Sequence, residues 1–229
     1  MSSRSKKVRS FSPSLVAHLS SMTDENSLQF HTESLEQSIK SHVESIVLDQ
    51  LLIDAKQLTD LLTDDSRFSN DYFHQIEQHR SHLQSNPLIT DLIRLTKSFF
   101  DKYLFSSILL RCYIQLHLPS TESGDNQRVN IQKEILKQLI EMKTIVQSNE
   151  NLFIDYFKKH YQILKSLNKY PMIEDFHLFL SAYERKMFHD LRSMILELRT
   201  IFLKTYDIIR KNLLHIQRPR TEPILSMIN

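Results

Sequence analysis

The sequence contains eleven histidines, so the first question is whether some of them could bind a metal ion. His74, His79 and His82 form the tightest group, and His79 and His82 could share one face of a helix. No cysteine or further ligand stands at a supporting distance in the sequence, and there is no HExxH motif. We therefore interpret these histidines as surface residues and expect neither a metal site nor a cofactor.

The sequence also gives little support for a catalytic nucleophile or a general acid–base pair. Cys112 lies in an apolar stretch, and nothing around it in the sequence would activate its thiol. A single glycine cannot build a GxSxG turn or a phosphate-binding loop. The carboxylate pairs Asp64/Asp65 and Glu174/Asp175 stand in a polar linker and at a helix start, where capping and the helix dipole explain them. We predict a protein that is not an enzyme.

The elements that position these residues are predicted to be helices. The chain has 229 residues and one glycine, Gly124, where an average chain carries roughly 7%. Tight β-hairpins need residues that accept positive φ, and glycine is their usual supplier. A chain with one glycine and six prolines has few such turns, so the sequence favours an all-α fold with few breaks.

The charge pattern argues against nucleic acid and membranes as partners. Lysine and arginine number 29 and aspartate and glutamate 27, spread along the chain with a net charge of +2. Nucleic-acid binding usually needs a clustered basic face, and a membrane span needs about 20 apolar residues in a row. The lone Cys112 cannot form an internal disulfide, which favours a reducing compartment. We expect the protein in the cytoplasm, the nucleus or both.

The one basic cluster lies near the start of the chain, at Arg4, Lys6, Lys7 and Arg9. It fits a solvated terminal tail, a nuclear signal or a transit peptide, since the serine-rich stretch before Asp24 has no acidic residue. The sequence leaves these three readings open.

Apolar periodicity divides the chain into helices and connectors. The second helix opens at Asn86-Pro87, a capping residue followed by a proline suited to the first helical position, and its apolar row includes Ile108. The predicted segments are a disordered tail 1–34, a helix 35–62, a polar connector 63–86, a helix from 87 that stops before Pro119, a loop 119–128, and helices 130–167 and 173–217 separated at Pro171. Within the connector, the sequence allows a helical turn around Tyr72–Ile76. We expect a domain division into 1–34, an N-terminal region 35–84 and a C-terminal domain 85–229.

Helices of this length joined by short connections indicate an elongated antiparallel four-helix bundle. The two longest would each span about 55–65 Å at 1.5 Å per residue. The residues that tolerate positive φ gather at one point, in the loop around Gly124 and Asn126. The residues alone do not choose among a scaffold, a helical signalling protein and a ring subunit.

Three stretches resemble the REG, or 11S-type, proteasome activators. The first is Ile114–Pro119 with the loop Glu122–Asn126 and the start of the next helix, and the second is Lys169–Phe176, which reads KYPMIEDF. The third comprises Leu196–Arg199, Tyr206–Asn212 and Arg218–Arg220. The order and spacing of the three are specific, and the family pattern can be laid from Ser85 to Arg220 without a gap.

The resemblance implies a non-catalytic activator subunit. Members of the family form heptameric rings of four-helix subunits, insert their C-terminal tails between the α subunits of the proteasome core particle, and press a loop on its gate without ATP. Carried over, the activation loop would be Ser123, Gly124, Asp125, Asn126, Gln127 and Arg128. The docking tail would be Met227, Ile228 and Asn229, and Lys169 would lie near the pore at the start of the fourth helix.

Departures from the family pattern fall on the loop. Asp125 stands where the family has asparagine, so an acceptor-only carboxylate replaces an amide donor, and Gln127 and Arg128 replace phenylalanine and glycine. A ring that docks on the core without opening it is therefore one alternative. A helical scaffold unrelated to the proteasome is the other. The sequence does not decide whether the ring consists of this chain alone or also of related chains.

Overall fold

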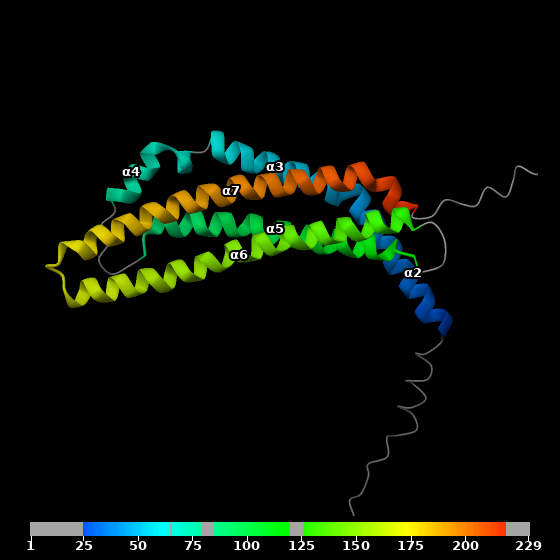
Figure 1. The fold of residues 1–229 in the computed structure, drawn as a ribbon, viewed down its shortest axis with the longest axis horizontal. Helices are drawn as coiled ribbons and strands as arrows, with labels where there is room; N and C mark the ends of the chain where they lie inside the picture. The colour runs from blue at the N-terminus through cyan, green and yellow to red at the C-terminus, as the bar shows by residue number, and fades with distance from the viewer. Residues whose placement is uncertain (1–24, 65, 79–84, 120–125, 219–229) are drawn as a thin grey trace, which may run out of the picture. The chain divides into compact units, whose positions relative to one another are not determined.

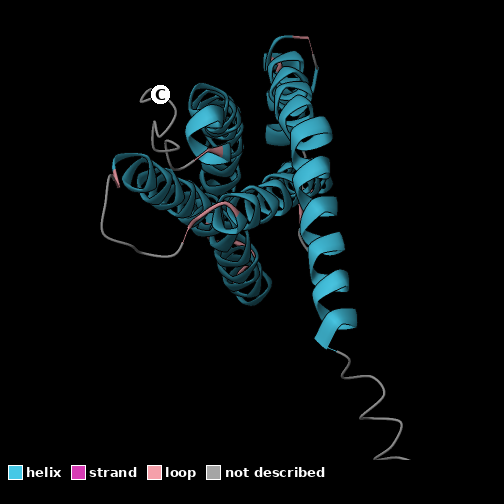
Figure 2. Ribbon diagram, turned by 90° about the vertical axis from the view of Figure 1, so that its right-hand side faces the viewer, coloured by secondary structure: helices cyan, strands magenta, loops and turns pink. Residues whose placement is uncertain are grey.

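The computed structural model describes residues 25–64, 66–78, 85–119 and 126–218. Every regular element in these ranges is a helix, as Figure 2 shows by colour. The elements are α2 (Glu25–His42), the π-helix η1 (Val43–Val47), α3 (Leu48–Thr63), the 3₁₀-helix η2 (Ser66–Phe68), α4 (Asn70–Gln78), α5 (Pro87–Leu116), α6 (Gln127–Lys169) and α7 (Glu174–Gln217). The predicted all-α fold is confirmed.

The chain forms two compact units, Met1–His42 and Val43–Asn229. In the first, α2 is the described element. In the second, α7 packs against α3, α5 and α6, and α6 also packs against α5. Figure 1 shows α5, α6 and α7 lying side by side along this unit. These four helices are the predicted four-helix bundle, and α6 and α7, with 43 and 44 residues, each span about 65 Å.

Prolines end the long helices where the sequence predicts. Tyr170 and Arg218 each precede a proline, and both have non-helical backbone angles. Tyr170 has φ −132° and ψ 65°, and Arg218 has φ −127° and ψ 75°. The ring of the following proline excludes the α conformation at these positions. At the start of α5, the Asn86 side chain accepts a hydrogen bond from the Leu88 amide at 3.1 Å, and Pro87 occupies the first turn. This predicted cap is confirmed.

The predicted start of the first helix is wrong. The helix expected from Leu35 begins at Glu25, so residues 25–34 of the predicted tail are helical, and residues 1–24 lie outside the described part. Apolar periodicity misses residues 25–34 because this part of α2 is largely polar, yet it contains neither glycine nor proline to interrupt a helix. The polar connector is also partly helical, with Phe68 and Phe73 packed on Phe188 at ring-centroid distances of 5.9 and 5.2 Å.

The core of the second unit follows the predicted apolar rows with one main exception. Phe100 stacks on Phe153 at 5.5 Å, and Tyr103 meets Phe202 edge to face at 5.3 Å. Ile108, expected in the core row of α5, is instead half exposed. Its row drifts around the helix because steps of five residues, such as Tyr103 to Ile108, place the second side chain on another face.

Candidate functional site

Three helix ends meet at one end of the second unit, where α5 ends, α6 begins and α7 ends. Gln132 of α6 ties them together, because its buried amide nitrogen donates to the carbonyl of Ile216 at 2.9 Å and to that of His117 at 3.3 Å. Carbonyls in the last turn of a helix have no partner within the helix. We call this region, with His117, Gln127 and Gln217, the loop–tail end.

A second contact fixes the chain segments that enter and leave this end. The Arg128 guanidinium of α6 donates to the carbonyl of Arg218 at 3.0 Å. Arg218 is the last described residue, and Asn126 is the first described residue after the α5–α6 loop. The loop and the segment after Arg218 therefore leave the bundle from neighbouring points.

Glu44 of η1 joins α5 and α7 at the same end. Its carboxylate accepts hydrogen bonds from the Tyr113 hydroxyl at 2.6 Å and from the Gln217 amide at 2.8 Å. Burial raises the pKa of Tyr113 far above its usual range, and the hydrogen bond to the Glu44 carboxylate raises it further. Tyr113 therefore remains a neutral donor, and its ring lies 4.6 Å from that of His117.

The predicted site residues fall into three groups. Ser123, Gly124 and Asp125 of the loop and Met227, Ile228 and Asn229 of the tail lie outside the described residues. Asn126 occupies the N-cap position of α6 without a capping hydrogen bond from its side chain, and the Asn130 amide donates to its backbone carbonyl at 2.9 Å.

The predicted place of Gln127 and Arg128 in the loop is wrong, because α6 begins at Gln127 and both residues are helical. Nothing in Gln127-Arg128-Val129 breaks a helix, so the loop ends at the asparagine. The predicted place of Lys169 at the start of the fourth helix is also wrong. Lys169 is the last residue of α6, not the first of α7, and its ammonium lies 5.0 Å from the Tyr170 ring centroid.

At the other end of the unit, sequence reasoning missed a buried polar cluster. The Glu184 carboxylate lies 3.2 Å from the ring nitrogen Nε2 of His160 and accepts a hydrogen bond from the Asn86 amide at 3.0 Å. The Asn86 amide also donates to the Ile76 carbonyl at 3.2 Å. The cluster joins α4, α5, α6 and α7. Its signal in the sequence was that His160 and Glu184 interrupt the apolar rows of their helices.

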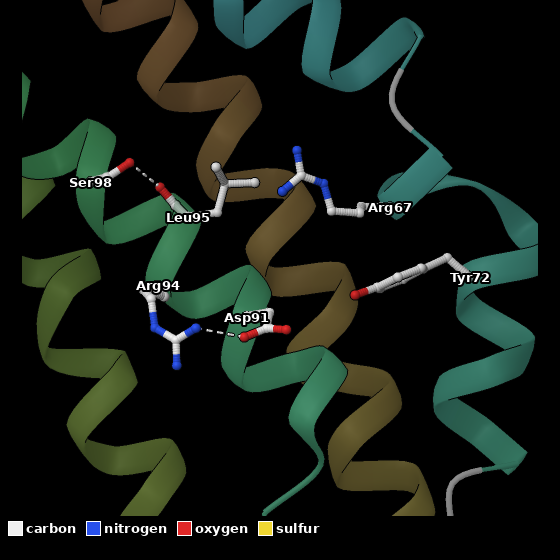
Figure 3. A pocket seen from close by; sticks show the side chains of 6 residues that line it. All are labelled: Arg67, Tyr72, Asp91, Arg94, Leu95 and Ser98. Atoms are coloured by element: carbon white, nitrogen blue, oxygen red, sulfur yellow. Dashed lines mark hydrogen bonds and ion pairs between the residues drawn. The ribbon is translucent and has the colours of Figure 1, made fainter.

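One surface pocket of about 500 Å³ lies between α5 and the segment of η2 and α4 (Figure 3). Arg67, Tyr72, Asp91, Arg94, Leu95 and Ser98 line it. The Ser98 hydroxyl donates to the Leu95 carbonyl at 2.7 Å, and Arg94 pairs with Asp91 at 2.7 Å. The serine has no base beside it among these residues, so the pocket has no arrangement for nucleophilic catalysis.

Metal-ligating side chains do not gather in the part of the chain that the structure describes. His74 lies in α4, whereas His79 and His82 are outside the described residues. Cys112 is a half-buried free thiol. None of the described helices is both long and apolar enough to span a bilayer.

A family model described as "Proteasome activator PA28, C-terminal" matches residues 82–224. The chain belongs to this family. The match includes the loop–tail end and the whole of α5, α6 and α7.

Among curated relatives, the human and mouse proteasome activator complex subunits 3 are each 29% identical over 143 residues, which cover 61% of this chain. The matched region spans 55% of the length of those subunits. Human proteasome activator complex subunit 2 is 26% identical over 164 residues, covering 71% of this chain and 69% of that protein.

Solved structures share the fold. The 11S subunit PA28 of Plasmodium falciparum superposes with a TM-score of 0.77 at 15% identity, over 90% of this chain and 100% of that one. The Trypanosoma brucei activator PA26, in its complex with the yeast 20S proteasome, superposes with a TM-score of 0.61 at 14% identity, over 83% and 97% of the two chains. The helical bundle is therefore an 11S-type subunit fold.

Proposed function

We propose that this chain is a subunit of a heptameric ring that docks on the proteasome core particle and regulates peptide hydrolysis without catalysis or ATP of its own. The single observation that carries the proposal is the loop–tail end. There the two segments that would contact the core, the loop before Asn126 and the tail after Arg218, leave one face of the bundle, linked through Arg128. The names of the curated relatives, proteasome activator complex subunits, support the same function.

Docking would rest on the tail residues Met227, Ile228 and Asn229, and gate contact on the loop around Gly124, Asp125 and Asn126. A single short tail is a weak contact, but tails tethered in one ring raise each other's effective concentration. The ring shifts the gate only if the loop contacts its open state better than its closed one. Lys169, at the exposed turn between α6 and α7, would lie at the far opening of the ring.

Hydrolysis of fluorogenic peptides by core particles, with and without the protein, tests the proposal. We expect a higher rate, and we expect deletion of 227–229 to abolish both the increase and co-sedimentation with the core while the ring stays intact. Co-sedimentation without a higher rate would favour the second candidate, a ring that binds without opening, for which Asp125 is the specific reason. No co-sedimentation at all would refute the proposal.

The proposal includes self-assembly, alone or with related chains, in the cytoplasm, the nucleus or both. Native mass of the purified chain tests the first part, since a chain that assembles alone gives a heptamer. Imaging of the tagged full chain tests the second, and removal of Arg4, Lys6, Lys7 and Arg9 shows whether these residues act as a nuclear signal.

A further inference from the structure

Two apolar side chains of α5 point away from the core of the second unit. Phe105 is 62% exposed and Ile108 50% exposed, although both lie in the middle of a helix of 30 residues. Phe105 is two positions from the fully buried Tyr103, about 200° around the helix, so it lies on the far side. Large apolar side chains that gather on an exposed helix face indicate an interaction surface.

A matching pair lies on the outer side of α7. Leu196 and Leu203 are seven residues apart, so they lie on one line of the helix, and they are 40% and 45% exposed. Thr205, two positions after Leu203, is fully buried and its hydroxyl lies 3.1 Å from that of Tyr103 on α5, so Leu203 lies about 200° around α7 from this contact. We call Phe105 with Ile108 the α5 face, and Leu196 with Leu203 the α7 face.

The two faces point in opposite directions. α5 and α7 meet across the core, where the Tyr103 ring lies edge to face on Phe202 and the Tyr103 hydroxyl lies 3.1 Å from the Thr205 hydroxyl. Side chains on the far sides of two helices that contact each other in this way face away from one another. A copy placed against the α5 face therefore leaves the α7 face of the first copy open.

Both faces also lie at the same height along the bundle. α5 and α7 run parallel, since Asn86 bonds Glu184 at one end and Gln132 bridges His117 and Ile216 at the other. Between these points Tyr103 is level with Thr205, so Phe105 is level with the region of Leu203. A head-to-tail contact closes into a ring only when it has no net rise from copy to copy, and otherwise it forms a filament.

We propose that the α5 face of each copy packs on the α7 face of the next, so that Phe105 and Leu203 form the centre of the contact that closes the ring. The partner that covers each face is a second copy of this chain. The two faces differ from each other, point in opposite directions and lie at the same height along the bundle, as a head-to-tail contact in a ring requires. Opposite charges stand at the rim: Asp101, whose exposed carboxylate also pairs with Lys97 at 3.3 Å, is one turn before Phe105, and the exposed Lys204 is beside Leu203. The inference rests on the proposed ring.

Glutamate substitutions in the full chain test the assignment. Phe105→Glu and Leu203→Glu each place a charge in the contact, and we expect native mass to fall from heptamer to monomer with unchanged helical content. Leu178→Glu is the matched control. Leu178 is a leucine of the same helix, 60% exposed, that lies 25 residues and about 37 Å from Leu203. It should remain heptameric.

Cross-linking distinguishes unlike faces from a face that pairs with itself. In a Cys112→Ser background, Phe105→Cys combined with Leu203→Cys should give a covalent ladder up to the heptamer with a short bismaleimide. Either cysteine alone should give no covalent dimer. Dimers from Phe105→Cys alone would overturn the assignment, because they would mean that α5 meets α5.

The outcomes separate this inference from the function on which it rests. A heptameric wild type that stays heptameric with Phe105→Glu or Leu203→Glu overturns the face assignment and leaves the ring. Loss of the heptamer in Leu178→Glu also overturns the assignment, since the contact would not be centred on the two faces. A wild type that never assembles refutes the ring itself.

Discussion

At the scale of single residues, Gln132 is the side chain that holds the loop–tail end together. It is fully buried, and its amide nitrogen serves carbonyls at the ends of two other helices. A carbonyl that is buried without a hydrogen-bond donor destabilises the fold, because it has lost its hydrogen bonds to water and gained none in return. An exposed carbonyl would still be hydrogen-bonded to water. One amide therefore keeps the loop and the tail at neighbouring points.

Replacing Gln132 by leucine removes both hydrogen bonds and puts an apolar side chain of similar size in the same place. We expect the free energy of unfolding, measured in urea at one fixed protein concentration, to fall by about 1–3 kcal/mol. The control is Gln138→Leu on the same helix, whose bond goes to the exposed Glu134 at 3.2 Å. It should change stability by less than about 0.5 kcal/mol. Equal losses for the two variants would contradict the role of Gln132.

Tyr103 gives the core a dependence on alkaline pH. Burial raises the pKa of its hydroxyl from 10.0 to about 12, and the bond to Thr205 lowers it by less. Above pH 10 the unfolded chain loses this proton while the folded chain keeps it, so stability is full below pH 10 and falls as pH rises toward 12. The slope from this group is about 1.4 kcal/mol per pH unit.

Urea unfolding of wild type and Tyr103→Phe between pH 8 and pH 12 checks this expectation. The variant lacks the titrating hydroxyl, so its stability should fall less steeply above pH 10 than that of the wild type. Parallel curves for the two proteins would show that Tyr103 does not titrate as its burial implies.

At the scale of elements, the start of α5 depends on Asn86. Its side chain caps the helix through the Leu88 amide and also donates to Glu184 and to the Ile76 carbonyl. A cap alone contributes about 1 kcal/mol, and the buried carboxylate adds to this because it would lose a partner. α4, α5 and α7 are thus joined at one residue.

Two substitutions separate the cap from the donors. Asn86→Ala removes both, and we expect it to lower the free energy of unfolding by about 2 kcal/mol or more. Asn86→Asp keeps the acceptor that caps α5 but places a second carboxylate against Glu184, so it should be at least as destabilising at neutral pH. If Asn86→Asp unfolds like the wild type in urea, the amide donors contribute little.

At the scale of the whole molecule, docking is expected to depend on several tails acting together. Rings assembled from mixtures of the full chain and a chain that lacks 227–229 should bind core particles with an affinity that falls faster than the fraction of intact tails. Co-sedimentation across a series of mixing ratios measures this relation. Binding in simple proportion to the intact fraction would mean that each tail acts independently.

The sequence predicted those parts of the fold whose cause is local. Pro171 and Pro219 restrict the residue before them, the Asn86 side chain accepts from the Leu88 amide, and the near absence of glycine disfavours hairpins. The start of α5 and the C-terminal ends of α6 and α7 could therefore be predicted. The sequence could not predict the first ten residues of α2 (25–34), because a polar helical segment has no apolar period. It missed η2 and predicted only a helical turn around Tyr72–Ile76 where the structure has α4, because a few aromatic side chains of this segment find a partner on α7 only after folding.

By itself, then, the sequence determined the helical class, the helix boundaries set by proline and asparagine, and the family pattern across α5 to α7. The tertiary structure decided which residues from distant segments meet. Gln132 reaches Ile216, Arg128 reaches Arg218, and Asn86 reaches Glu184 across separations of 84, 90 and 98 residues. Helix periodicity fixes the face on which a side chain lies, but the partner of that face depends on how the helices pack, and no local pattern contains that information.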